Sequence, residues 1–373
     1  MAAFDRRDWF HRLFGFTEEG YEKTQASFVV EEDAEDPKML LLKSLGNGAT
    51  FRAGHFDTPS LAELRAASSP SSVTGQRLRV RNEIGDVAAK HALPENRLAT
   101  FQVASQFNCL EFVGPSVVPE DGITGYVMDR TQGPACSIAC GPATVVRNYF
   151  APLGGSVGQR RGRQINNLQD FLAELDELCN PTAPESHALG TAPFLRVRSG
   201  YTEASFRELQ RLNRALKGLS EEQLDRLRGK LRIGLHEEVQ VTSTAWGAKL
   251  VHPSANQLVT QVFGSACSVA YSRDSSRDDW EPVARLILEA SYEATLLAAL
   301  KQAIKHEGRE GSNRVFLTCL GGGVFGNSME WILDAMRRAF LQLKEADLDV
   351  RIVTYAGSPG PHLLQLEREF DGR

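Results

Sequence analysis

The stretch RVFLTCLGGGVFGNS, residues 314–328, is the most informative part of the 373-residue chain. Its first seven residues are mostly apolar and predict a buried strand over 314–320. Three consecutive glycines follow, and residues 329–344 then have the spacing of apolar side chains that is typical of a helix. Residues 350–355 predict a further strand. This region therefore predicts the order strand, glycine loop, helix, strand, which is typical of α/β proteins.

The glycine loop has two interpretations. Backbone N–H groups in a loop between a strand and a helix can approach a phosphate closely, and the helix N-terminus favours negative charge. Alternatively, the loop is a tight turn that needs glycine for its backbone angles. The run Gly321-Gly322-Gly323 together with Gly326 is more than a turn requires, so we favour phosphate binding. The lysine and hydroxyl of a nucleoside-triphosphate P-loop are absent, and no N-terminal dinucleotide-binding unit surrounds the loop.

A second buried strand is predicted over residues 99–105, and polar side chains follow it. These are Gln106, Asn108 and Glu111. The carboxyl ends of strands line the ligand crevice of open α/β sheets, so the amides could contact a ribose or a base. On the local sequence alone, capping of the next turn is an equal alternative.

Acidic residues continue through the glycine-rich loop that comes next. Glu120, Asp121 and Asp129 follow Glu111 in this loop. Hydrolysis of a glycosidic bond passes through an oxocarbenium-like state and uses a pair of carboxyl groups. Each acid alone is more often a solvated loop residue, whereas for the set beside a strand end a catalytic pair and solvated residues are equally expected.

The loop is followed by a helix predicted over residues 134–149, with a kink at Gly141-Pro142. Gln132-Gly133-Pro134 opens this helix and indicates close backbone packing or a second N-terminus that faces phosphate. Further strands are predicted over 26–30, 39–42, 50–53, 78–82, 238–244 and 257–263, and further helices over 8–16, 168–178, 202–216 and 282–306, with two more starting at 59 and 220.

Alternating buried strands and helices predict a three-layer α/β/α sandwich. No linker is visible, so one domain is expected over 1–373. It would consist of an N-terminal extension, 1–98, and a catalytic core, 99–373, with a helical insertion at about 160–235.

Composition excludes several classes of function. The net charge of -5 gives no indication of a basic surface for nucleic acid. For the basic run 160–163, a solvated loop is favoured over a phosphate-binding patch. Arg147 and Arg273 could pair with phosphate or with acids. Six cysteines without a C-x-x-C pair indicate a reducing compartment. Neither a signal peptide nor a transmembrane run is apparent, so a cytoplasmic or nuclear protein without a membrane partner is expected.

Metal and serine-hydrolase chemistry are also not predicted. No histidine has a partner at metal or triad spacing, and the G-x-S-x-G motif is absent. No cofactor is therefore expected, although Mg²⁺ held by the acidic loop stays open.

These motifs resemble macrodomain-type ADP-ribosylhydrolases. Residues 321–327 are similar to the distal phosphate-binding loop of macrodomains. Residues 106–111 and 129–134 are similar to a hydrolase family that includes a bacterial effector removing ADP-ribose from an arginine of ubiquitin. The acidic loop followed by a helix resembles the poly(ADP-ribose) glycohydrolase branch. The glycine triplet followed by Gln-Glu-Glu of that branch is absent, so mono-ADP-ribose is the expected substrate.

The resemblance implies roles for particular residues. The catalytic acids would be Glu111, Asp121 and Asp129, with the division of labour among them unassigned. Ribose and other ligand contacts would come from Gln106, Asn108 and Gln132, and the diphosphate would lie against Gly322, Gly323, Val324, Phe325, Gly326 and Asn327. The implied partner is an ADP-ribosylated protein, with ubiquitin as a candidate and arginine as the linked side chain.

Two other functions are compatible with the same motifs. An ADP-ribose reader without turnover would need the glycine loop but not the acids. A hydrolase of a free ADP-ribose derivative would need both.

Overall fold

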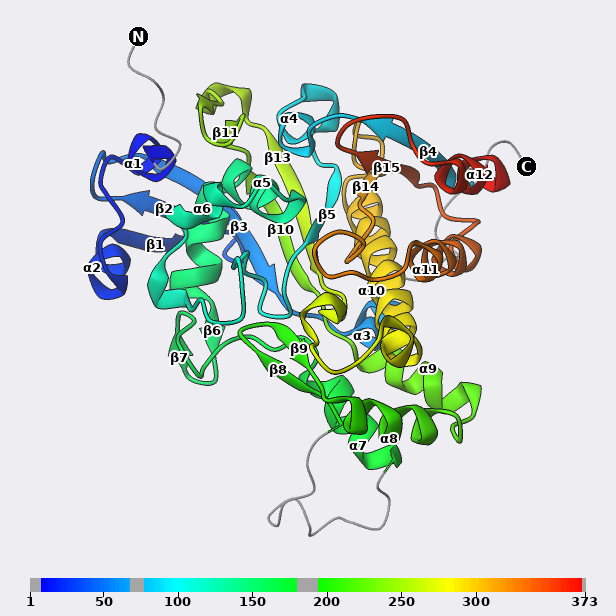
Figure 1. Cartoon of the computed structure of the whole chain (residues 1–373). Coiled ribbons are helices and arrows are strands. Elements are labelled where there is room, and N and C mark those ends of the chain that lie inside the picture. Colours follow the sequence, from blue (N-terminus) through cyan, green and yellow to red (C-terminus); the bar gives the residue numbers. More distant parts are fainter. Residues whose placement is uncertain (1–7, 68–76, 180–193, 371–373) are drawn as a thin grey trace.

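The computed structural model describes residues 8–67, 77–179 and 194–370 (Figure 1). Within these ranges, nine strands form one central mixed sheet. In spatial order they are β1 (Phe28–Glu32), β2 (Leu40–Ser44), β3 (Thr50–Asp57), β10 (Gly234–Gln240), β13 (Leu258–Gly264), β5 (Thr100–Ala104), β14 (Arg314–Leu317), β15 (Asp349–Thr354) and β4 (Arg79–Ile84).

The direction of the strands decides where a site can form. The neighbours β13, β5, β14, β15 and β4 run parallel, so their carboxyl ends lie along one side of the sheet. The strands β1, β2, β3 and β10 continue the sheet in antiparallel pairs. Loops that are distant in sequence therefore meet after β5, β13 and β14.

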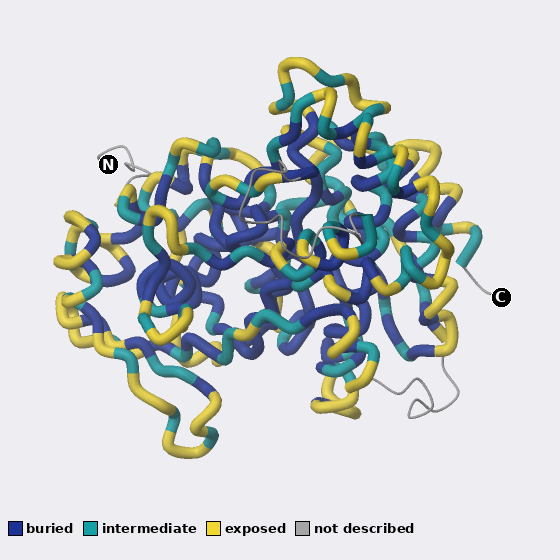
Figure 2. Tube along the Cα trace, turned by 90° about the horizontal axis from the view of Figure 1, so that it is seen from below, coloured by how far each residue is buried: buried dark blue, intermediate teal, exposed yellow. Residues whose placement is uncertain are grey.

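Helices cover both faces of the sheet. On one face, the long helix α10 (Arg277–Lys305) packs with α3 (Leu61–Ala67) and α11 (Met329–Gln342), and α12 (Pro361–Phe370) packs against α11 and β4. The other face carries α4 (Val87–His91), α5 (Gln132–Ala139), α6 (Gly141–Val145) and the N-terminal helices α1 (Trp9–Phe14) and α2 (Tyr21–Ala26). Figure 2 shows the buried trace in the interior and the exposed trace around it. The predicted three-layer α/β/α sandwich is confirmed.

The region predicted as an insertion carries α7 (Gln169–Cys179), α8 (Phe206–Leu216) and α9 (Glu221–Lys230), with the hairpin of β8 (Arg196–Arg198) and β9 (Tyr201–Glu203) between α7 and α8. All three helices belong to the same apolar core as α10. Two smaller hairpins pair β6 (Pro152–Leu153) with β7 (Ser156–Val157), and β11 (Ser243–Thr244) with β12 (Lys249–Leu250).

The N-terminal residues belong to the central sheet. Strands β1 to β3 extend one end of the sheet, and β4 pairs with β15 at the other end, with Arg79 opposite Asp349. The region predicted as an extension over 1–98 therefore supplies both edges of the sheet.

Several predicted boundaries were displaced, and for three of them the structure gives a local reason. The strand predicted over 238–244 is β10, which starts at Gly234, because a bulge with Glu238 at φ 52 interrupts its alternation. Helix α10 begins at Arg277, ahead of Pro282, because a Ser276–Asp279 capping box sets its N-terminus. Helix α8 begins at Phe206 after a similar box at Ser205. The predicted kink is confirmed, since α5 ends at Ala139 and α6 starts at Gly141.

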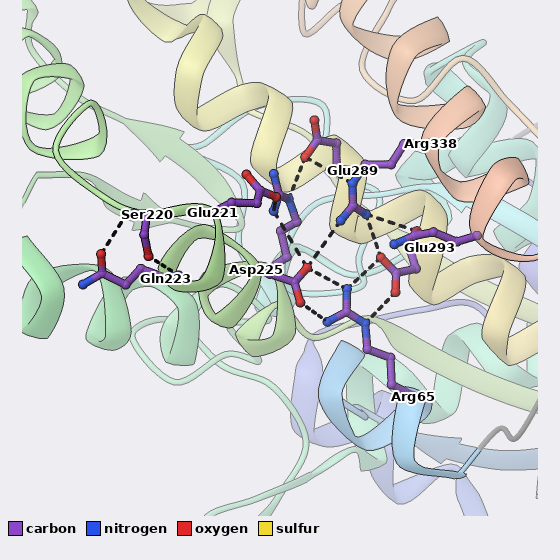
Figure 3. A network of polar contacts seen from close by, with 10 residues as sticks. Arg65, Ser220, Glu221, Gln223, Asp225, Glu289, Glu293 and Arg338 are labelled. Atoms are coloured by element: carbon purple, nitrogen blue, oxygen red, sulfur yellow. Dashed lines mark hydrogen bonds and ion pairs between the residues drawn. The ribbon is translucent and has the colours of Figure 1, made fainter.

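A network of ion pairs ties α9 to the core helices (Figure 3). Arg65 of α3 bonds to Asp225 of α9 at 2.8 Å and to Glu293 of α10 at 2.5 Å. Arg338 of α11 approaches the same Glu293 at 2.9 Å. Only 6% of the Glu293 side chain is exposed. Water therefore cannot readily solvate the charges that remain if one member of this network is removed.

We expect Glu293→Gln to lower the free energy of unfolding by roughly 2–4 kcal/mol, because two arginines lose their shared, mostly buried countercharge. Chemical denaturation followed by circular dichroism measures this change. Glu222→Gln, on the exposed side of α9, is the matched control and should change little. Equal stability of the two variants would contradict the role of this network.

Candidate active site

A cavity of about 260 Å³ opens at the carboxyl ends of β5, β13 and β14. Its lining comes from two segments that are far apart in the sequence, together with two tyrosines. The lining residues are Ala104, Ser105, Gln106, Glu111, Phe112, Val113, Asp129, Thr131, Gln132, Pro134, Tyr201, Ala266, Tyr271, Thr318, Cys319, Leu320, Gly321, Gly323, Val324 and Phe325. The early acidic loop and the late glycine loop therefore share one cleft.

A tight turn after β5 presents Glu111 to this cavity. The Gln106 side chain spans the turn, since its Nε2 donates to the Phe112 carbonyl at 3.2 Å and its Oε1 accepts the Phe112 N–H at 2.9 Å. Asn108 Oδ1 accepts the Leu110 N–H at 3.1 Å. Cys109 lies in the left-handed region with φ 61, which is rare for a residue with a side chain. The turn is thus fixed by its own polar side chains.

Glu111 has the environment of a proton donor. Its side chain is 1% exposed, and neither carboxyl oxygen has a hydrogen-bond partner in the described part of the chain. Burial raises the pKa of Glu111 to about 8, while the positive charge of Arg147 and the nearby hydroxyl groups of Ser105 and Ser137, which lie outside good hydrogen-bond geometry, act in the opposite direction. The group is therefore largely protonated at neutral pH and can donate a proton to a reacting bond.

The other predicted acids lie in different places. Asp129 is half-buried and lines the cavity, where its carboxylate accepts the Thr131 N–H at 3.0 Å. Asp121 is exposed, is not part of the cavity lining, and accepts the Val118 N–H at 2.9 Å. We therefore correct the prediction for Asp121. Its carboxylate closes a local turn, because a short 3-10 turn leaves N–H groups that need an acceptor.

The glycine loop is held in shape from behind. Gly321 and Gly326 adopt φ values of 72 and 74, which favour glycine. Asn327 Nδ2 donates to the Cys267 carbonyl at 2.8 Å, and the Asn327 N–H donates to the Gly321 carbonyl at 3.0 Å. Asn327 and Gly326, both predicted as diphosphate contacts, thus do not line the cavity but stabilise the loop that does.

The front of the loop offers unpaired donors. In the described part of the chain, the N–H groups of Gly323, Val324 and Phe325 donate to no protein acceptor, and all three residues line the cavity. Gly322 is turned away, because a Cβ there would lie 2.9 Å from Ile332 of α11. Since α11 begins at Met329 directly after the loop, its N-terminus adds partial positive charge nearby. This geometry suits a phosphate or diphosphate.

The amides predicted as ribose contacts are occupied by the protein. Gln106 and Gln132 line the cavity, but the Gln132 amide bonds to the backbone of Gln102 and Ala104 at the end of β5, both at 2.8 Å. Asn108 lies outside the lining and donates to Gln164 at 2.8 Å. The turn-capping alternative holds for these side chains, because buried backbone groups at a strand end need partners.

An aromatic cluster at the cavity was missed. The ring centroids of Tyr201 and Tyr271 lie 5.0 Å apart, and that of Phe325 lies 5.4 Å from Tyr201. Tyr201 is brought in by Gly200, where a Cβ would meet Gln106 at 2.5 Å. The predicted strand over 257–263 ends just before Ala266 and Tyr271, so the strand-end rule that identified Glu111 could also have found these residues.

A smaller pocket of about 110 Å³ continues from the cavity toward β4 and β15. It shares Thr131, Gln132 and Thr318 with the main cavity. Asp86 and Tyr355, each just past the carboxyl end of a strand, line its far side, and Tyr355 is 71% exposed.

Among the described residues, no group of three or more His, Cys, Asp or Glu side chains is suited to hold a metal ion. Within the same part of the chain, no helix has both the length and the apolar character needed to cross a membrane.

No protein-family model matches the chain, and no curated protein sequence is significantly similar to it. Among solved structures, the poly(ADP-ribose) glycohydrolase of Thermomonospora curvata bound to the inhibitor ADP-HPD has a TM-score of 0.43 and 13% identity, covering 98% of this chain and 99% of the other. The Deinococcus radiodurans poly(ADP-ribose) glycohydrolase in complex with ADP-ribose has a TM-score of 0.39 and 13% identity, covering 85% and 94%. These similarities are too weak to place the chain in that family.

The close contact between Glu111 and α5 generates a test of the site. A Cβ at Gly133 would overlap both the Ala104 carbonyl and the Glu111 carboxyl group. We expect Gly133→Ala to displace Glu111 and to weaken binding of ADP-ribose, the ligand that the sequence predicts, at least about tenfold, because the cavity wall must shift. Isothermal titration calorimetry measures the affinity. Gly125→Ala, where a Cβ meets nothing within 4 Å, is the control, and an equal affinity in both variants would contradict the assignment.

Proposed function

We propose that the chain is an ADP-ribosylhydrolase that cleaves the glycosidic bond between ADP-ribose and a protein side chain. One observation carries this proposal. A buried carboxyl group without a protein partner, that of Glu111, faces the same cavity as the unpaired N–H groups of residues 323–325. A reader module needs the N–H groups but gains nothing from an unpartnered buried acid, which costs stability.

The geometry supports a division of labour among the acids. With the diphosphate on residues 323–325, Glu111 donates its proton to the leaving nitrogen or oxygen as the bond to the anomeric carbon breaks. Water adds to that carbon, and its surplus proton returns to the Glu111 carboxylate. Asp129 accepts hydrogen bonds from the ribose hydroxyls.

The far end of the ligand fits the smaller pocket. We place the adenine there, because the smaller pocket adjoins the main cavity at Thr131, Gln132 and Thr318 and offers room for the end of the ligand beyond the diphosphate. The Tyr355 ring offers an exposed aromatic face, and the Asp86 carboxylate offers an acceptor for an exocyclic amine. Asp86 Oδ1 is oriented by the Ala88 N–H at 2.9 Å.

We infer that the substrate is mono-ADP-ribose on arginine, with modified ubiquitin as a candidate partner. The similarity of residues 106–111 and 129–134 to an arginine-specific hydrolase family supports this choice. Val113 and Val324 also line the mouth of the cavity and are 55% and 57% exposed. Exposed apolar side chains around a mouth favour a protein surface over a free nucleotide as the substrate.

The catalytic role of Glu111 is tested by release of ADP-ribose from an arginine-modified protein. Glu111→Gln should lower the rate at least about 100-fold, since the amide cannot donate the proton. Because the group must be protonated to act, wild-type activity should persist below and fall above the pKa of about 8. Asp121→Asn is the control and should retain near wild-type turnover. Full turnover in Glu111→Gln would exclude this mechanism, and tight binding without release by the wild type would indicate a reader.

The linkage is tested separately with matched substrates. One protein is prepared with mono-ADP-ribose on arginine, on glutamate or on serine, and poly(ADP-ribose) is added as a fourth substrate. We expect the largest kcat/KM for the arginine-linked group, because Glu111 would protonate a departing guanidine. Release is followed by chromatography of free ADP-ribose. Preferential release from the polymer would contradict the mono-ADP-ribose specificity.

A further inference from the structure

A fully enclosed arginine lies behind the turn that presents Glu111. Arg147 belongs to η6 (Val146–Phe150), a π-helical turn that follows α6, and its side chain is inaccessible to solvent. The guanidinium lies 3.8 Å from the ring centroid of Phe263 in β13. The sequence left open whether this arginine pairs with phosphate or with an acid. The structure shows that its direct partners are neither.

All the hydrogen-bond partners of Arg147 are neutral. Its Nε donates to the Cys109 carbonyl at 3.1 Å, and one Nη donates to Ser137 Oγ at 3.0 Å and to Thr144 Oγ1 at 3.1 Å. The other Nη lies 3.3 Å from His236 Nδ1, and burial holds the pKa of His236 well below its ordinary value. No carboxylate in the described part of the chain forms an ion pair with Arg147, so a costly buried charge has only neutral hydrogen-bond partners.

The carboxyl group that interacts with this charge is that of Glu111. Only the Tyr126 phenol interacts with Arg147 more strongly, and burial raises the pKa of this phenol, so it stays neutral. Arg147 acts to lower the pKa of Glu111 against the effect of burial, and Glu111 in turn favours the charged form of Arg147. The other titratable groups that interact with Glu111 are Asp129, Tyr126, Tyr201, Cys109 and Cys136, and none of these is a cation. When Glu111 loses its proton, the positive charge of Arg147 therefore stabilises the carboxylate.

The same arginine supports the backbone next to Glu111. Cys109 has φ 61, a conformation that persists only where surrounding contacts hold it. The bond from Arg147 Nε fixes the Cys109 carbonyl, and Asn167 Nδ2 donates to Cys109 Sγ at 3.2 Å. Through Ser137, Arg147 also contacts α5, whose first turn borders the Glu111 carboxyl group.

We propose that Arg147 is a positioning residue, which holds the Glu111 turn and stabilises the Glu111 carboxylate formed when its proton passes to the leaving group. This inference rests on the proposed hydrolysis. Arg147 does not reach the substrate, because it is enclosed and is absent from the cavity lining. Its buried charge, costly in the resting protein, is balanced only while Glu111 is ionised.

The test uses two variants of the full chain and a readout that needs no turnover. Arg147→Gln removes the charge, and Arg147→Lys keeps the charge but loses the planar set of donors. The Glu111 carboxyl resonance is assigned by comparison with Glu111→Gln and titrated by ¹³C NMR. We expect Arg147→Gln to raise the pKa of Glu111 by about one unit or more, as loss of a nearby opposite charge does. Arg147→Lys should leave the pKa nearly unchanged.

Kinetics then separate the two roles of Arg147. In both variants kcat should fall at least about tenfold while the KM for the modified protein changes little, because the turn is loosened but the ligand contacts remain. The basic limb of the pH profile should move upward only in Arg147→Gln. Arg228→Lys controls for general destabilisation, because Arg228 of α9 is also buried but is ion-paired. This variant should change neither kcat nor the basic limb of the pH profile.

An unchanged titration of Glu111 in Arg147→Gln would overturn the proposal. If that variant does not fold, Arg147→Lys decides, since an unchanged kcat in that variant would equally exclude a positioning role. Failure of the proposed function can be distinguished from failure of this inference. In that case the wild type releases no ADP-ribose, while the NMR titration still reports the coupling between the two side chains.

Discussion

The site depends on the burial of one carboxyl group that the protein does not satisfy. Enclosing Glu111 without a hydrogen-bond partner opposes folding, and the surrounding structure offsets this cost. The Gln106 side chain closes the turn, Gly133 leaves room for the carboxyl group, and Arg147 lies behind it. A group kept protonated in this way is ready for proton transfer before any ligand binds.

The central sheet determines why the glycine loop lies opposite that turn. Strands β5 and β14 are neighbours and parallel, with Phe101 opposite Phe316, so the segments that follow them leave the sheet at the same side. More than 200 residues separate the two segments in the sequence. The pairing of these two buried strands therefore brings Glu111 and the unpaired N–H groups of residues 323–325 to the same cavity.

Much of this arrangement could be predicted from local sequence. Apolar runs followed by glycine or by amides identified the ends of β5 and β14, and hence Glu111 and residues 323–325. The roles of Asn108, Gln132 and Asn327 could not be predicted. A polar side chain after a strand serves the backbone or a ligand equally well, and only the positions of neighbouring N–H and C=O groups decide. Asp121 was misjudged for the same reason, since its distance from the cavity depends on how the loop folds.

Other features depend on contacts between distant segments. Tyr201 reaches the cavity because Gly200 lets a hairpin of the helical insertion approach Gln106, and no local pattern indicates that approach. The bounds of β10 were mispredicted because a bulge interrupts the alternation of its side chains. The start of α10 was mispredicted because a capping box precedes the proline. Periodicity was most reliable in elements such as α11, whose apolar face is covered by a single neighbouring layer.

The placement of β4 has a consequence for biosynthesis. This strand is made early but pairs only with β15, whose residues 349–354 are translated some 270 positions later. A nascent chain on the ribosome thus carries an unpaired strand for most of its synthesis, a condition that favours chaperone binding. The glycine loop is also translated more than 200 positions after Glu111, so the cavity between them can form only late in synthesis.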